Sequence, residues 1–306
     1  MKMQHPPEIH HIKSISQLVK LLGLAAPLHP LIALVDYTKV PAEMFPKWQK
    51  VSLDFYKISF KTAFTGQIRY GQGYYDFEEG GLAFLKPWQI VLPPEDAGSY
   101  EGIALYFHPD FIRNYPLGKT IHQYGFFSYD VSEALFLSAR EKEVIAGLFA
   151  VIAAELDNNI DPFSQDVLVS QLELLLNYSN RFYNRQFITR KAVNHDIVTV
   201  LDQLLERYFE EENSLKSGLP TVKYISTELK LSQRYLSDML SSLTGLSTQQ
   251  YIQNAVIEKA KEKLSATSLS VSEIAYGLGF EHSQSFSKLF KARTRVSPLE
   301  FRKSFR

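Results

Sequence analysis

The sequence contains no cysteine among its 306 residues. Disulfide scaffolds, thiolate zinc sites, iron–sulfur clusters and cysteine nucleophiles are therefore excluded. The chain also lacks a net charge, because 33 basic residues balance 33 acidic ones. This balance excludes a globally basic surface for nucleic acid, but it leaves room for a local basic face. Long apolar runs and a signal peptide are missing too, so we expect a cytoplasmic protein without a membrane span.

The composition is that of an ordinary globular protein, with 45% hydrophobic and 22% charged residues. A chain of this length suggests two domains. Its two ends differ, because most aromatic residues precede Tyr183 while residues 288–306 hold seven basic residues against the single Glu300. A local positive patch is therefore expected at the C-terminal end.

The first half of the chain favours short strands. Apolar or alternating segments are separated by Gly and Pro turns, which is typical of a sandwich or barrel. Two helices are expected to follow, the second of them starting at Asp161-Pro162. The expected strands lie at 31–35, 51–60, 82–85, 89–92 and 102–108, and the expected helices at 133–156 and 163–182.

This half shows no pattern typical of an enzyme. His108 and His122 do not form the alternating His cluster that a metal-dependent barrel enzyme needs, so we expect no catalytic residue, no metal and no cofactor. The aromatic side chains have two possible roles, to form a barrel core or to line a pocket for an apolar or ring-shaped effector. Core packing is favoured for most of them. These aromatics are Trp48, Phe55, Tyr56, Phe60, Tyr70, Tyr74, Tyr75, Phe77, Phe84 and Trp88.

The second half is expected to be wholly helical. Its helix starts are marked by the capping boxes Ser247–Gln250 and Ser270–Glu273 and by Pro298 after Ser297. Gly245 and Gly279 stand where helix ends require a residue that tolerates positive φ. The expected helices cover 194–211, 221–229, 232–243, 247–265, 270–277, 282–293 and 297–303.

An internal repeat lies within these helices. The segment Ile225-Ser-Thr-Glu-Leu229-Lys-Leu231-Ser232 corresponds to Ile274-Ala-Tyr-Gly-Leu278-Gly-Phe280-Glu281, and each is followed by a longer helix with apolar anchors on one face. The pattern predicts two helix-turn-helix units. The helix of 247–265 joins them, and its span of roughly 25–30 Å would place two recognition helices about one DNA turn apart.

With these two units, the sequence resembles the AraC family of bacterial transcription regulators. The second unit carries Ala275-x-x-x-Gly279-Phe280, Phe286-Ser287-Lys288-x-Phe290-Lys291, Val296-Ser297-Pro298 and Phe301-Arg302, and the first carries Tyr235-Leu236-Ser237 and Thr244-Gly245. The sequence departs from the family at Lys230 and Arg295, where small residues or glycine are usual, and we expect those turns to differ in detail.

The resemblance implies a multi-domain α+β protein with a cupin-like β-barrel at 1–131, a helical dimerisation segment at 132–183 and a linker at 184–193. An all-α double helix-turn-helix domain would follow at 194–306. It also implies double-stranded promoter or operator DNA as the partner, together with RNA polymerase, a homodimeric state and an unidentified small-molecule effector. Activation and repression both stay open.

The outward faces of the two recognition helices are predicted to touch DNA. Arg234 suits guanine and Gln284 suits adenine, while Asp238 either accepts from cytosine or orients Arg234. Lys291, Arg293, Arg295, Arg302 and Lys303 are predicted to hold phosphates. The predicted DNA-contacting set is Gln233, Arg234, Ser237, Asp238, Ser283, Gln284, Ser287, Lys288, Lys291 and Arg293.

Pairing of subunits is predicted for the helices of 133–183, where Leu168, Leu172, Leu175 and Leu176 form a stripe. Two alternatives to a sequence-specific regulator stay open. One is a cupin-type enzyme or small-molecule binder with an accessory DNA-binding domain, and the other is a DNA-bending protein without sequence preference, whose binding would rest on phosphate contacts.

Overall fold

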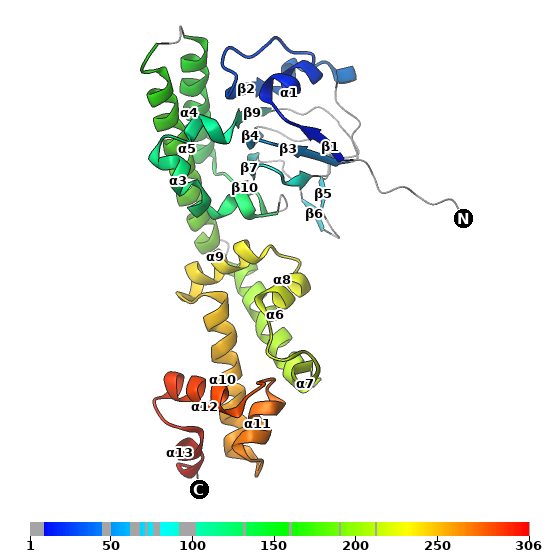
Figure 1. Ribbon diagram of the computed structural model, residues 1–306, viewed down its shortest axis with the longest axis vertical. Coiled ribbons are helices and arrows are strands. Elements are labelled where there is room, and N and C mark those ends of the chain that lie inside the picture. Colours follow the sequence, from blue (N-terminus) through cyan, green and yellow to red (C-terminus); the bar gives the residue numbers. More distant parts are fainter. Residues whose placement is uncertain are drawn as a thin grey trace, which may run out of the picture. The chain divides into compact units, whose positions relative to one another are not determined.

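A computed structural model of the chain describes residues 9–44, 50–61, 68–70, 73–75, 80–91, 102–130, 133–158, 161–189, 191–211 and 213–305 (Figure 1). The chain divides into two compact units between Gln186 and Phe187. The N-terminal unit combines sheets with helices, whereas the described part of the C-terminal unit is all-helical.

The described strands of the N-terminal unit form three sheets. The largest is fully antiparallel, with the order β10-β7-β4-β9-β2, and in a three-stranded sheet of order β1-β3-β8 the first pair is parallel. Strands β5 and β6 pair with each other. The strands are β1 Ile9–Ile12, β2 Ile32–Asp36, β3 Lys50–Leu53, β4 Tyr56–Lys61, β5 Ile68–Tyr70, β6 Gly73–Tyr75, β7 Gly81–Leu85, β8 Ile90–Val91, β9 Gly102–Phe107 and β10 Leu135–Phe136.

Two expectations for this unit need correction. The single strand expected at 51–60 is two strands, β3 and β4, which belong to different sheets because the chain bends at Asp54 and Phe55. The five-stranded sheet ends at β10 and β2, and no pairing among the described strands closes it into a barrel. The structure therefore supports a unit of helix plus sheet, which is coarser than the expected cupin-like barrel.

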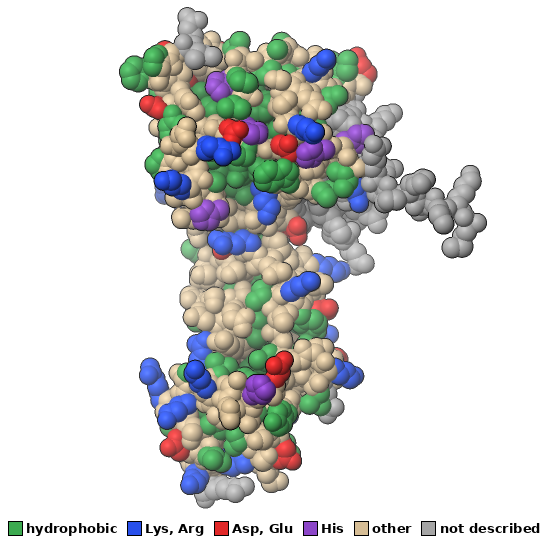
Figure 2. Space-filling model, viewed as in Figure 1, with side chains coloured by type: hydrophobic (Ala, Val, Ile, Leu, Met, Phe, Trp, Pro, Cys, Tyr) green, Lys and Arg blue, Asp and Glu red, His purple; other side chains and the backbone are tan. Residues whose placement is uncertain are grey.

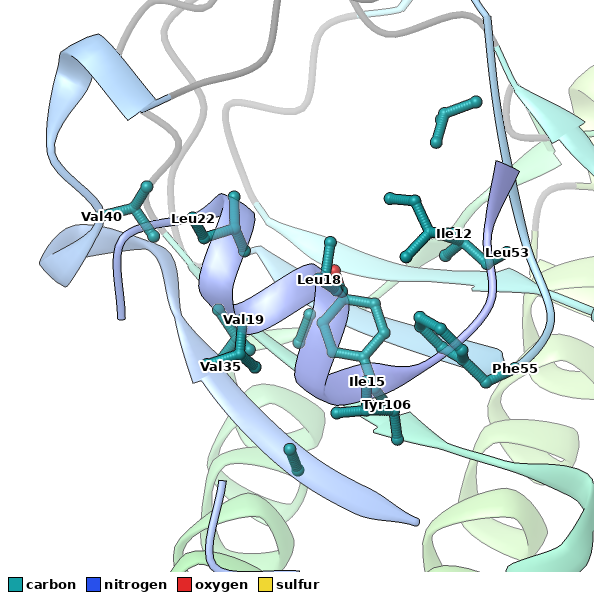
Figure 3. Close-up of a cluster of buried hydrophobic side chains, with 13 residues drawn as sticks. Ile12, Ile15, Leu18, Val19, Leu22, Val35, Val40, Leu53, Phe55 and Tyr106 are labelled. Atoms are coloured by element: carbon teal, nitrogen blue, oxygen red, sulfur yellow. The ribbon is translucent and has the colours of Figure 1, made fainter. Parts of the chain in front are cut away.

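The five-stranded sheet is packed on both faces. On one face Phe60 contacts Phe149 of α4 (Ala139–Asp157), and Phe84 contacts Tyr183 of α5 (Ser164–Thr189), with ring centroids 5.6 Å and 6.2 Å apart. On the other face Tyr106 belongs to a buried cluster with residues of β1, β3 and helix α1 (Ile15–Leu21), shown in Figure 3. The shorter helices are α2 Pro109–Ile112, α3 Pro116–Thr120 and the 3-10 turns η1 Tyr37–Lys39, η2 Ala42–Met44, η3 Ile121–Gln123 and η4 Gly125–Ser128.

Three of the described aromatic residues belong to the core, as expected for most of them: Phe55, Phe60 and Phe84 are buried. Tyr56 is half-buried, and Trp88 is 68% exposed in a turn with φ 62°. Trp48 and Phe77 lie outside the described residues, as do the side chains of Tyr70, Tyr74 and Tyr75.

The segment expected as a linker is helical up to Thr189, because α5 continues through it. The buried residues Phe182, Tyr183, Gln186 and Phe187 of α5 follow a helical spacing that the polar Gln186 disguises in the sequence. The Gln186 side chain accepts from the Phe136 amide at 2.8 Å and donates to the Ala134 carbonyl, so this residue fastens α5 to β10.

The leucine stripe predicted for dimerisation is core. Leu168, Leu172, Leu175 and Leu176 are each at most 4% exposed. Their side of α5 packs within the chain and is not available to a partner, so the prediction of an interface at these leucines is wrong.

The C-terminal unit follows the predicted helices closely and adds one short helix, α7, that the sequence did not reveal. Within the described residues, no helix of either unit is both long and apolar enough to cross a membrane. The helices are α6 Lys191–Glu210, α7 Asn213–Ser217, α8 Val222–Leu229, α9 Gln233–Thr244, α10 Thr248–Ala266, α11 Val271–Gly277, α12 Ser283–Thr294 and α13 Pro298–Lys303.

Candidate nucleic-acid interface

The sequence repeat corresponds to a repeat of hydrogen bonds. In the first turn the Leu231 amide donates to the Ser226 carbonyl at 2.9 Å, and in the second the Phe280 amide donates to the Ala275 carbonyl at 3.0 Å. The ends of α9 and α12 match as well, since the hydroxyls of Thr244 and Thr294 donate to the carbonyls four residues earlier at 2.7 Å and 2.8 Å. The two units therefore share one backbone design, a helix, a tight turn and a longer second helix.

Left-handed backbone also recurs at equivalent places. Lys230 (φ 56°) corresponds to Gly279 (φ 93°) in the turns, and Gly245 (φ 71°) corresponds to Arg295 (φ 69°) after the second helices. The turns at Lys230 and Arg295 were expected to differ because these side chains disfavour that conformation. That expectation is wrong, since the surrounding hydrogen bonds hold both residues in the left-handed region.

The apolar anchors of α9 face inward as predicted, with Tyr235, Leu236, Met239 and Leu240 all buried. The opposite face presents Gln233 and Arg234 as exposed residues and Ser237 and Asp238 as half-buried ones. The Arg234 Nε donates to Asp238 Oδ2 at 2.9 Å, one helical turn away. Of the two roles considered for Asp238, the structure thus contains the one that orients Arg234.

Helix α12 repeats this arrangement. Phe286 and Phe290 are buried and pack on each other, and Phe290 also contacts Phe301 of α13. The predicted contact residues lie away from this core: Gln284 and Lys288 are exposed, and Ser283 and Ser287 are half-buried. Both recognition helices thus offer polar side chains at their N-terminal half, the part that reads base edges in helix-turn-helix proteins.

Helix α10 joins the two units. It starts with the predicted capping box of Ser247 and Gln250 and packs its buried side, including Ile252, Val256 and Ala260, against both units. Its 19 residues give a rise of about 27 Å, a length comparable to one turn of DNA.

Positive charge gathers on the second unit. Lys288, Lys291, Arg293, Arg295 and Lys303 are exposed, and Figure 2 shows Lys and Arg side chains along one edge of the C-terminal unit. Among the described residues, no carboxylate lies within ion-pair distance of Lys288, Lys291 or Arg295. These ammonium and guanidinium groups are therefore available to an anionic partner.

Two arginines of this region have protein partners. Arg293 Nη2 donates to Gln253 Oε1 of α10 at 2.6 Å while its side chain stays exposed. Arg302 donates to the carbonyls of Leu264 at 3.3 Å and Leu269 at 2.6 Å, which fastens α13 to the end of α10. The prediction that Arg302 holds a phosphate is replaced by this internal role.

The N-terminal unit offers no comparable site in its described residues. His108 accepts from the Asp110 amide at 3.2 Å and caps α2, and no group of three or more His, Asp or Glu is placed to hold a metal ion in the described part of the chain.

Comparison with known proteins supports the helical unit. Residues 225–304 match the family described as helix-turn-helix domain. The chain is 35% identical over 97 residues to an uncharacterized HTH-type transcriptional regulator, YisR, of Bacillus subtilis, which covers 32% of this chain and 33% of that protein. It is 32% identical over 142 residues to the HTH-type transcriptional activator RhaS of Salmonella schwarzengrund, covering 45% of each chain.

A solved structure also aligns with this unit. It is a transcriptional regulator of the AraC-type DNA-binding domain-containing proteins from Chromobacterium violaceum, 22% identical, covering 37% of this chain and 96% of that one, with a TM-score of 0.33. The chain spans between a third and a half of the length of the two curated relatives.

Proposed function

We propose that the chain is a regulator of the AraC type, which binds double-stranded DNA through its C-terminal domain and regulates transcription in a sequence-specific way. Helices α9 and α12 read base edges in two successive major grooves. The observation that carries the proposal is the repeated unit itself, in which both recognition helices hold a buried apolar side and an outward polar side at opposite ends of α10.

Base readout is assigned to the outward residues of these helices. Arg234 and Gln284 have the donors that suit guanine and adenine, and Lys288 lies one turn beyond Gln284. The remaining members of the predicted set, Gln233, Ser237, Asp238, Ser283 and Ser287, line the same faces. Lys291, Arg293, Arg295 and Lys303 contact phosphates, which fix the position of the protein without specifying sequence.

The first test is a selection from random duplex DNA with the full chain. A sequence-specific regulator enriches a site with two conserved base sets about one helical turn apart. A protein that only bends DNA enriches no motif, and its affinity falls with salt equally for all sequences. Absence of a motif would therefore remove the proposal in favour of that alternative.

The N-terminal unit is proposed to regulate this binding. Its helix-plus-sheet architecture is compatible with a cupin-like sensor for a small-molecule effector, with RNA polymerase as a further partner and the cytoplasm as the location. The competing proposal, a cupin-type enzyme with an accessory DNA-binding domain, requires a metal. Titration of the purified protein with Zn²⁺, Fe²⁺ and Mn²⁺ in a calorimeter separates the two, because tight stoichiometric binding would favour the enzyme.

Homodimerisation is retained as a proposal but moves to another surface, the outer side of α4. Six exposed residues recur there with alternating spacings of three and four: Arg140, Glu143, Gly147, Ala150, Ala154 and Asp157. The centre of this α4 stripe is small and uncharged, and a Cβ on Gly147 would meet no atom within 4 Å. A second helix can therefore approach closely.

The charges of the α4 stripe favour a second copy in antiparallel orientation. Arg140 lies in the first turn and Asp157 at the last residue, so each charge is at the end of the helix dipole that disfavours it. In an antiparallel pair centred between Gly147 and Ala150, Arg140 of one copy lies opposite Asp157 of the other. Each unfavourable charge then gains both an ion-pair partner and the favourable dipole end of its neighbour.

A charge exchange tests this surface. Arg140→Asp should shift the full chain from dimer to monomer in light scattering at tens of micromolar, and the double variant Arg140→Asp, Asp157→Arg should restore the dimer. Arg113→Asp on the same unit is the control, because Arg113 pairs with Asp110 within its own chain. A wild-type chain that stays monomeric both free and on DNA would contradict homodimerisation.

A further inference from the structure

We infer that the segment formed by α6 and α7 is a brace that fixes the separation of α9 and α12, so that Tyr208 and Ser214 act as positioning residues for the spacing of the two DNA sites. This inference rests on the proposed function. The brace, residues 191–217, precedes both helix-turn-helix units in the sequence, and Figure 1 shows it beside α8 at one end and near α11 at the other.

The brace contacts the first unit through Tyr208. This side chain is 4% exposed, and its ring meets the edge of Tyr224 of α8 with centroids 5.0 Å apart. Leu204 and Leu205 of α6 are buried as well. Helix α6 is thereby packed on the first helix of the first unit.

The brace contacts the second unit through Ser214. This serine is 1% exposed, and its hydroxyl donates to the Gly277 carbonyl at 2.7 Å. Gly277 is the last residue of α11, where carbonyls have no partner within the helix. A side chain of α7 thus completes the hydrogen bonding of a helix that lies 63 residues further along the chain.

Two glycines bring the same parts together at backbone distance. A Cβ on Gly279, in the turn of the second unit, would lie 2.5 Å from the carbonyl carbon of Gly218, just after α7. Both glycines have left-handed backbone, and the Tyr208 hydroxyl donates to the Gly218 carbonyl at 2.9 Å. Tyr208 therefore touches the first unit with its ring and, through Gly218, the turn of the second unit with its hydroxyl.

The brace is also fastened to the connector. The Tyr251 hydroxyl of α10 donates to Asp202 Oδ1 of α6 at 2.7 Å. Burial of the hydroxyl, and to a smaller extent this hydrogen bond, raises the pKa of Tyr251. Further along α10, the bond to Glu262 of the same helix raises the pKa of Lys259, and the charges of Glu206 and Glu210 on α6 act in the same direction. The hydrogen bond from Tyr251 to Asp202 therefore ties α6 to α10.

These contacts matter for DNA because the two helix-turn-helix units are otherwise joined through α10, on which both of them pack. In the sequence, the connection runs through α10 and the non-helical residues 267–270. A brace that touches both units adds a second connection and restricts their movement relative to each other. The pair of recognition helices is then rigid and accepts one separation of its two base sets.

The absence of cysteine allows a direct measurement of this rigidity in the full chain. Spin labels are placed on exposed residues away from the recognition helices, with Glu228→Cys on α8 and Ser272→Cys on α11. Pulsed electron resonance then gives the distribution of label–label distances. We expect a narrow distribution for the parent and a distribution at least about twofold wider after Tyr208→Phe combined with Ser214→Ala.

Matched controls separate positioning from simple loss of packing. Tyr276→Phe and Ser268→Ala remove the same atoms from exposed residues whose hydroxyls bond no side chain or carbonyl in the described part of the chain, and they should leave the distribution unchanged. Circular dichroism confirms that each variant is folded, and Tyr208→Phe alone serves if the double variant is not. An unchanged distribution in folded brace variants overturns the brace.

A second experiment measures DNA binding. It uses the selected site and versions of that site with one or two base pairs added between the two base sets. The wild type should lose about tenfold or more in affinity for the lengthened sites. The brace variants should lose less than about threefold, with their affinity for the unaltered site reduced. Equal discrimination by wild type and variants would overturn the role in spacing. If no site can be selected, the proposed function fails, while the spin-label distances still decide the brace.

Discussion

The guanidinium of Arg234 is held by Asp238, with Nε donating to Oδ2 at 2.9 Å across one turn of α9. The Arg234 side chain is 47% exposed, so the pair contributes at most about 0.5 kcal/mol to stability in solvent. Its effect is geometric: the bond occupies Nε and fixes the position of the guanidinium, whose two terminal nitrogens carry donors that suit guanine.

Replacing Arg234 should alter base preference more than folding. We expect Arg234→Ala to weaken the selected site by roughly 1–3 kcal/mol and to relax preference at one position. Lys303→Ala should weaken all sequences alike, since a phosphate contact carries no sequence information. Binding to the selected and scrambled sites by fluorescence anisotropy measures both. An equal loss on the two DNAs for Arg234→Ala would contradict base readout by this residue.

The left-handed residue that follows α12 offers a stabilising change. Arg295→Gly should raise the free energy of unfolding by about 0.5–1 kcal/mol, because glycine adopts φ 69° without the Cβ strain of arginine. Gly245→Ala at the equivalent position of the first unit should lower it by about 1 kcal/mol, although the added methyl group meets no atom within 4 Å. Urea denaturation of both variants checks the opposite signs.

The two capping boxes after the recognition helices should respond differently to acid. Glu300 accepts from the Ser297 amide, and this hydrogen bond, with help from nearby Lys291 and Lys303, holds the pKa of Glu300 below its usual 4.5. A lowered folded-state pKa means that the stabilisation is complete above about 4.5 and is lost as pH falls through the folded-state value. The equivalent residue Gln250 makes the same bond without titrating.

Glu300→Gln should therefore keep the capping bond and remove part of the acid sensitivity of the second unit. Urea unfolding followed between pH 3 and 6 should show a flatter stability profile for Glu300→Gln than for the wild type. Parallel profiles that differ only by a constant offset would show that ionisation of Glu300 does not contribute.

The burial of the α5 leucines predicts that alanine substitutions at two nearby leucines have very different effects on stability. Leu172 is fully buried, so Leu172→Ala should cost about 2–5 kcal/mol of stability. Leu174 is 46% exposed, so Leu174→Ala should change stability by no more than about 0.5 kcal/mol. Thermal unfolding measures both, and a stable, monomeric Leu172→Ala chain would contradict the packing described here.

The C-terminal unit should fold alone, and its boundary can be tested. Phe187 is 2% exposed and its ring packs edge-on against Tyr235 of α9 with centroids 5.2 Å apart. A fragment of residues 187–306 should be more stable than one of residues 193–306, which lacks this ring, by about 3 kcal/mol. Equal unfolding midpoints in urea would show that Phe187 does not belong to the unit.

Much of the helical unit follows from local chemistry and is therefore visible in the sequence. Ser247, Ser270 and Ser297 each begin a helix with a capping side chain three residues later, and the structure contains all three capping boxes. The inward anchors of α9 and α12 follow a helical spacing that one sequence window reveals. These features depend on residues three or four positions apart, so tertiary structure does not override them.

Other features depend on partners far along the chain. The residues around Gln186 do not show that its side chain accepts from the backbone amide of Phe136 in β10. The sequence therefore predicts a linker where the structure has the end of α5. The stripe of leucines on α5 has the same spacing whether the chain itself or a second subunit covers it, and the structure shows that the chain itself buries these leucines. Likewise, the sequence does not distinguish Arg302 from the basic residues around it, and only the folded chain shows that it donates to the carbonyls of Leu264 and Leu269.

Periodicity and capping within short stretches of sequence predict both the two helix-turn-helix units and the outward sides of α9 and α12. The contacts of α6 and α7 with those units are visible only in the folded chain. The bond from Ser214 to Gly277 and the close approach of Gly218 to Gly279 connect residues about 60 positions apart. A short stretch of sequence cannot predict which distant carbonyl accepts the hydrogen bond of a serine hydroxyl.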